Sequence, residues 1–134
     1  MGIKTFLNYN SDFHEKMEDM KKDESYFTDS FRDLFILGMC YAAKNSLKPL
    51  ELGEVKKQDT IRIGEVIKED HMFLFKVLAF SHTKDYKVLS NETQVYELAE
   101  KFANAGIKEI IDKYYKTDYP SFELAAVALE DSDE

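Results

Sequence analysis

The sequence predicts an all-α protein, a compact bundle of about five helices with one long helix in its C-terminal half. Two segments, residues 31–44 and 71–82, are apolar on almost every side, which is typical of helices buried among neighbours. A third segment repeats apolar residues in steps of three and one from Val95 to Tyr115, which is the period of an amphipathic helix. These three helices would form most of the core.

Residues 31–44 are predicted to form the central helix. Between Phe31 and Ala43 the only charged residues are Arg32 and Asp33. Ser30 is a suitable N-cap, and Asp33 stands where the acidic partner of a capping box belongs. The helix would end at Lys44, since Asn45, Ser46 and Pro49 follow.

The N-terminal part is predicted to be peripheral. Residues 1–10 have no clear period and are expected to form an arm on the core. Residues 11–24 are predicted to form a surface helix capped by Ser11, held by a thin apolar stripe of Phe13, Met17 and Met20.

The segment between the two buried helices leaves two interpretations open. Residues 60–67 alternate briefly at Ile61 and Ile63 and then lose the alternation, so a short extended segment and a helical turn fit equally well. One strand could not form a sheet by itself. Asp70 is then expected to cap the helix over residues 71–82.

Asn91 is a suitable cap for the long helix, predicted over residues 92–116. Gly106 lies on its apolar stripe, which keeps its phase beyond the glycine. We therefore prefer one continuous helix in which Gly106 permits a close helix crossing, with the small-residue face around Gly38 as its expected neighbour. Two helices broken at Ala105–Gly106 are the alternative. The predicted core is Phe35, Leu37, Cys40, Leu74, Leu78, Leu98, Phe102 and Ile110.

Length and composition predict one helical domain over residues 1–129, ending in a short helix over residues 121–129, with a disordered acidic tail at 130–134. Six of the 26 acidic residues lie in the last seventeen positions, where no basic residue occurs. The net charge of −8 therefore belongs mostly to the C-terminal end, and strong general binding to nucleic acid is not expected. The longest uncharged apolar run is too short for a bilayer, there is no signal-peptide pattern, and Cys40 is the only cysteine, so a cytoplasmic protein is expected.

No motif for catalysis, a cofactor or a metal is present, so no enzyme activity, cofactor or metal is predicted. His14 and Glu18 have the spacing of two ligands on one helix, but no third ligand is visible. Cys40 lies among apolar residues, where a thiol is usually inert. Paired carboxylates such as Glu97 and Glu100 are interpreted as a solvated face.

A mixed-charge connection after the central helix is the candidate partner-binding surface. Five basic residues and one asparagine fall within nineteen positions, offset in part by nearby acidic residues. These residues could contact a phosphate group or an acidic partner, although such a mixture more often forms simply a soluble loop. The candidates are Lys44, Asn45, Lys48, Lys56, Lys57 and Arg62, with Gly38, Pro49 and Gly106 predicted to be structural.

Three stretches in order, LGMCYAAKNSLKPL, AFSHTKDYKVL and LAEKFANAGIKEII, resemble a small family of accessory proteins encoded beside Dnd-type DNA phosphorothioation modification–restriction systems. The resemblance covers about residues 28–112. Its motifs are structural, and the chain departs from them at Tyr41, which is not adjacent to Gly38, and at Ala105, where the family has Gly. The matching positions are Gly38, Tyr41, Asn45 and Pro49, followed by Phe102, Ala103, Asn104, Ala105 and Gly106.

The resemblance implies a role in bacterial defence against foreign DNA and transfers no catalytic residue. Our first hypothesis is a non-enzymatic accessory protein that acts through protein partners of a DNA modification or restriction system. The alternative is a small acidic inhibitor or DNA mimic that occupies a nucleic-acid-binding protein. The partner and the oligomeric state are left open.

Overall fold

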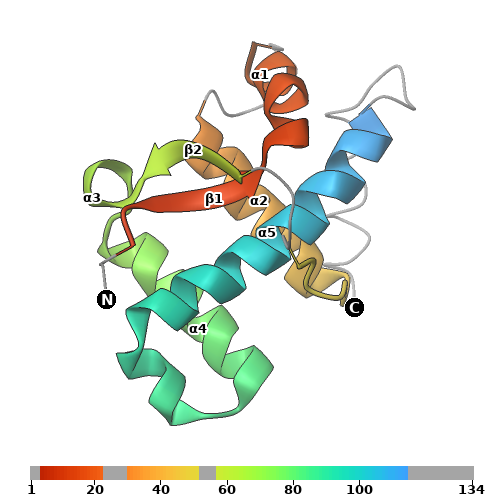
Figure 1. Cartoon of the computed structure of the whole chain (residues 1–134). Coiled ribbons are helices and arrows are strands. Elements are labelled where there is room, and N and C mark those ends of the chain that lie inside the picture. The colour runs from red at the N-terminus through yellow and green to blue at the C-terminus, as the bar shows by residue number, and fades with distance from the viewer. Residues whose placement is uncertain (1–3, 23–29, 52–56, 115–134) are drawn as a thin grey trace.

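A computed structural model describes residues 4–22, 30–51 and 57–114, and the expected mostly helical fold is confirmed (Figure 1). A small sheet and two short 3-10 helices accompany the α-helices of this part. In chain order the elements are β1 (Phe6–Asn10), η1 (Ser11–Phe13), α1 (His14–Lys22), α2 (Phe31–Lys44), β2 (Lys57–Arg62), α3 (Ile63–Val66), α4 (Glu69–Thr83), η2 (Tyr86–Ser90) and α5 (Glu92–Tyr114).

The crossing of α2 and α5 organises the core, and two glycines make it close. A Cβ atom built on Gly106 would lie 2.5 Å from the carbonyl carbon of Gly38 and 2.9 Å from its Cα. A Cβ atom built on Gly38 would lie 2.6 Å from Ile107 Cγ1 and 2.9 Å from the carbonyl oxygen of Ala103. The two backbones are therefore in direct contact. α5 runs unbroken through Gly106, so the alternative with a break at Ala105–Gly106 is wrong.

The arm expected at residues 1–10 contains a strand. β1 pairs antiparallel with β2, from Phe6 opposite Arg62 to Asn10 opposite Lys57, with an irregular step between Leu7 and Asn8. Residues 60–67 contain both of the structures considered for them, because β2 ends at Arg62 and α3 begins at the next residue. The sheet lies between α3 and α1 in Figure 1, and α5 runs beside β1.

The predicted surface helix over residues 11–24 is observed as η1 followed by α1. Met17 and Met20 are buried, as the stripe predicts. The side chain of Asn10, rather than Ser11, caps the segment by accepting a hydrogen bond from the backbone N–H of Asp12.

Neither α2 nor α4 is buried on most sides, and that expectation is wrong for both. In α2 the buried residues form a single stripe, while Cys40 is exposed on the opposite side and was wrongly placed in the core. In α4 only Phe75 and Ala79 are buried. The physical reason is the same: each helix packs its neighbours on one face, and apolar composition does not tell how many neighbours a helix has. α4 begins at Glu69, one residue before the expected cap Asp70, and its N-cap is Lys68.

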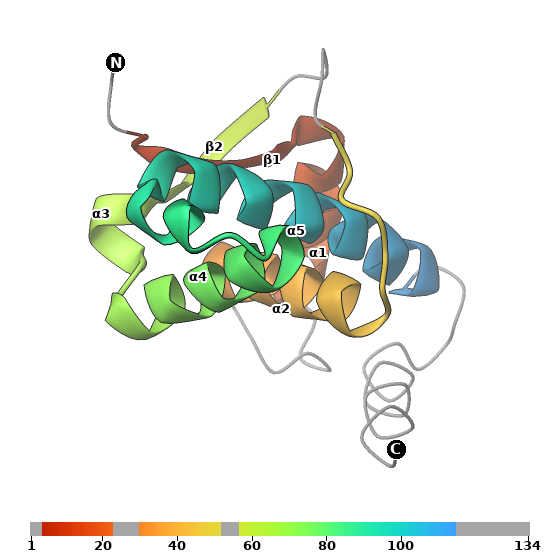
Figure 2. The same ribbon diagram turned by 90° about the horizontal axis from the view of Figure 1, so that it is seen from below.

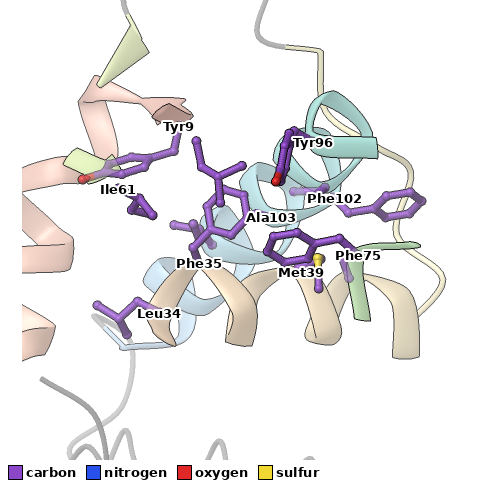
Figure 3. Close-up of a cluster of buried hydrophobic side chains, with 14 of the residues drawn as sticks. Tyr9, Leu34, Phe35, Met39, Ile61, Phe75, Tyr96, Phe102 and Ala103 are labelled. Carbon is purple, nitrogen blue, oxygen red and sulfur yellow. The ribbon is translucent and has the colours of Figure 1, made fainter. Parts of the chain in front are cut away.

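The core itself lies between α2, α5, α4 and the sheet (Figure 3). Phe35, Phe102 and Ile110 are buried in it, as predicted. The other predicted core leucines, Leu37, Leu74, Leu78 and Leu98, are partly buried and pack against it. The short helix expected at residues 121–129 and the acidic tail at 130–134 lie outside the described residues.

Candidate functional site

A hydrogen-bonded chain of polar side chains joins the sheet to α1. The Tyr9 hydroxyl lies 2.7 Å from His14 Nδ1 and 3.2 Å from Thr60 Oγ1. His14 Nε2 lies 3.0 Å from Glu18 Oε1. The Tyr9 hydroxyl donates to Thr60, and His14 lies between Tyr9 and Glu18 with one ring nitrogen toward each, so the three side chains form one linked series.

The order of Tyr9, His14 and Glu18 resembles that of a catalytic relay, but the environment of these side chains favours a structural role. Tyr9 has no exposed surface, and burial raises the pKa of its hydroxyl to about 12. A phenol that holds its proton this firmly is a poor nucleophile or base near neutral pH. The hydrogen bonds instead fix α1 on the sheet, and the His14 ring adds a stacked contact with Phe31.

A second buried polar group connects α5 to the free edge of β1. The Asn8 N–H donates to Glu100 Oε2, and the Asn10 N–H donates to Asn104 Oδ1 at 2.7 Å. Lys4 Nζ lies 3.0 Å from Glu100 Oε2. Two backbone donors on one strand edge therefore find acceptors on a helix, which closes an edge that would otherwise be open to another strand.

Glu100 was interpreted from the sequence as part of a solvated face, and this is wrong. It is 4 % exposed, and its burial raises the pKa of the carboxyl group despite the opposing effect of the Asn8 N–H and Lys4. Its signal in the sequence was its place four residues before Asn104 on the flank of the apolar stripe. Asn104 belongs to the FANAG stretch of the family resemblance, so that stretch serves the packing of α5.

The predicted partner-binding residues near the end of α2 are placed in two ways. Lys44 and Lys48 are exposed. Asn45 closes the end of α2, because both its backbone N–H and its side-chain amide donate to the Tyr41 carbonyl oxygen, at 3.0 and 2.9 Å.

The remaining candidates lie on the sheet. Lys57 and Arg62 are exposed at opposite ends of β2, and Lys56 lies outside the described residues. Figure 2 shows the end of α2 and β2 on opposite sides of α5, so the structure does not gather these residues into one patch. Pro49 lies in the segment that crosses α5, next to Leu50, whose N–H donates to the Lys101 carbonyl oxygen.

An open hollow lies at the start of α5, lined in part by Lys4, Lys87 and Lys101. Lys101 pairs with Glu51 at 3.2 Å and Lys4 pairs with Glu100, while Glu92 and Glu97 add negative charge to the lining. The hollow therefore lacks the concentrated charge that would hold an anion. No group of three or more His, Cys, Asp or Glu side chains is arranged to hold a metal ion in the part of the chain that the structure describes.

The strongest candidate is the outer face of α4 with η2, which sequence reasoning missed. The large hydrophobic side chains that are exposed among the described residues all lie there: Phe73 (70 %), Val77 (48 %) and Tyr86 (76 %). Half-buried Phe80 links them, since its ring centroid lies 4.6 Å from that of Tyr86. We call Phe73, Val77, Phe80 and Tyr86 the α4 strip. Its signal in the sequence is that α4 contains more apolar residues than its two buried positions require. From the sequence, this excess is interpreted as burial in the core.

A continuous exposed apolar surface on a helix is a common mark of a contact with another macromolecule. None of the helices in residues 4–22, 30–51 and 57–114 combines the length and apolar character needed to cross a membrane. The fold and this surface thus define a small, mostly helical protein with an exposed apolar face on α4.

The family is shown by comparison with known sequences. A sequence model of the family described as DNA sulphur modification system-associated protein 4 matches residues 8–133, and the chain belongs to this family. The resemblance to accessory proteins of Dnd-type systems is thereby confirmed. No curated protein and no solved structure matched the chain.

Proposed function

We propose that this chain is a non-enzymatic component of a DNA sulphur modification system and that it acts through protein contacts made by the α4 strip. The family places the chain in association with such a system. The observation that supports the mode of action is the strip, because exposing a phenylalanine and a tyrosine to water is unfavourable unless a partner covers them.

The polar groups that could otherwise support chemistry have structural roles. Tyr9, His14 and Glu18 join α1 to the sheet, and Glu100 and Asn104 join α5 to β1. A protein whose buried polar groups hold its own elements together is suited to presenting a rigid surface.

The test is complementation in a host that carries the system but lacks this gene. The readouts are the phosphorothioate content of the DNA and the exclusion of unmodified plasmid. Whichever of the two the deletion changes is then measured for each variant. We expect Phe73→Ser and Tyr86→Ser to behave like the deletion. Because both side chains are exposed, the variants should melt like wild type.

Two matched controls address catalysis. Tyr9→Phe and His14→Gln interrupt the polar chain and should complement as wild type does. The proposal is contradicted if the strip variants complement fully, or if the deletion changes neither readout.

A further inference from the structure

We propose that the α4 strip pairs with the same strip of a second copy of this chain, with the two α4 helices antiparallel across a two-fold axis. The inference rests on the proposed function, in which the strip is a protein-contact surface, and it names the partner.

The pattern of the strip is self-complementary. Glu69, Phe73, Val77 and Phe80 follow one another at steps of three or four residues, so they lie along one side of the helix, and Lys84 follows Phe80 by four residues as the C-cap of α4. Phe73 and Phe80 are equally far from the point between Lys76 and Val77, and so are Glu69 and Lys84. Two antiparallel copies centred on that point bring Phe73 of each beside Phe80 of the other.

The charges at the two ends support the same arrangement. Glu69 and Lys84 are both exposed, and neither pairs with another described residue. They are separated by about 22 Å along the helix, at a rise of about 1.5 Å per residue. In the antiparallel pair each Glu69 meets the Lys84 of the other copy, giving two ion pairs. A parallel pair would instead set Glu69 against Glu69 and Lys84 against Lys84.

The position of α4 leaves room for such a pair. Figures 1 and 2 show α4 at the edge of the helical layer, and its buried residues Phe75 and Ala79 face inward. The ring of Phe75 contacts those of Phe35 and Tyr96 on this inner side. One helix face from each copy is a small interface, so we expect reversible dimerisation in the micromolar range or weaker.

The first measurement is sedimentation equilibrium of the full chain over a wide concentration series. We expect a mass that rises from that of the 15.6 kDa chain toward twice this value. A single monomeric mass at every concentration would overturn the inference.

Charge reversal tests the arrangement of the pair. Glu69→Lys and Lys84→Glu each replace two attractive contacts by repulsive ones and should raise the dimer dissociation constant by roughly tenfold or more. The double variant, and an equimolar mixture of the two single variants, should recover wild-type association. Glu97→Lys, an exposed charge change on α5, is the matched control and should have no effect.

The inference would be overturned if neither single variant raised the dimer dissociation constant, or if the double variant did not restore it. The two copies would then pair elsewhere or in another orientation. A monomer whose Phe73→Ser variant still fails in complementation would leave the proposed function standing with another protein as the partner. A dimer with the predicted charge behaviour and fully active strip variants would instead contradict the proposed function alone.

Discussion

Gly106 shows how a single residue can determine the spacing of two helices. A side chain at this position would meet the backbone of Gly38, which cannot move aside as a flexible side chain could. Gly106→Ala gains about 1 kcal/mol of helix propensity, whereas overpacking of this kind costs about 3 kcal/mol or more. The net loss of about 2 kcal/mol or more should appear in urea unfolding.

Gly64 provides the matched control, because it is also helical and a Cβ atom on it would meet nothing within 4 Å. Gly64→Ala should be neutral or stabilising by up to about 1 kcal/mol. Since α5 is continuous, Gly106→Asn should destabilise at least as much as Gly106→Ala. A well-tolerated Gly106→Asn would contradict the crossing described above.

Glu100 predicts a pH dependence of stability with a definite sign. Its pKa in the folded protein is raised, first by desolvation, above an ordinary value of 4.5. The folded state therefore holds this proton more tightly than the unfolded state, so the contribution to stability is present below the unfolded pKa and is lost as pH rises through the folded pKa. Lys4 and Lys57 are the cations that oppose the shift, from the residues before β1 and from β2.

The measurement is urea unfolding of wild type and Glu100→Gln from acid pH to neutrality. The glutamine keeps an oxygen for the Asn8 N–H but carries no charge, so its free energy of unfolding should improve relative to wild type as pH rises. A wild type that instead gains on the variant with rising pH would show that Lys4 outweighs burial. Glu97→Gln serves as the control for losing one exposed carboxylate.

Among the elements, two substitutions in α4 test whether this helix is packed on one face only. Phe75 has no exposed surface, so Phe75→Ala should cost about 3–5 kcal/mol of unfolding free energy. Phe73, two positions away and 70 % exposed, should change stability by about 0.5 kcal/mol or less when replaced by Ala. Equal losses for the two variants would mean that both faces of α4 are buried.

The long helices could be predicted from the sequence because their signals are local. α2 begins and ends at the predicted residues, since Ser30 caps it and Asn45 closes it. The strands could not be predicted, because β1 and β2 are about fifty residues apart and each is too short to show a clear alternation. The buried pair of Glu100 and Asn104 depends on that same distant contact, so the sequence showed only its place on the flank of the apolar stripe.

The candidate site was visible in the sequence only as an excess of apolar residues in 71–82. We interpret that excess as burial in the core, because burial inside one chain and burial against a partner leave the same composition. Only the coordinates separate Phe75, which faces the core, from Phe73, which does not. The predicted basic residues do not form one patch, although Lys44 and Arg62 are close in the sequence. The end of α2 and β2 lie on opposite sides of α5 (Figure 2).

For the whole molecule, the glycine contact and buried polar bonds hold α2, α5 and the sheet together, and α4 carries the exposed strip. Tyr9, Glu100 and Asn104 each bond to another element of the fold. We expect a partner to cover the α4 strip when the protein works in its DNA sulphur modification system.

Hydroxyl-radical footprinting with mass spectrometry tests whether the α4 strip is covered. Oxidation of Phe73 and Tyr86 is compared between the dilute purified chain and cells that carry the system, with half-buried Tyr41 on α2 as the internal reference. We expect Phe73 and Tyr86 to be protected from oxidation in the cells relative to Tyr41. Equal oxidation of Phe73 and Tyr86 in both settings would contradict it.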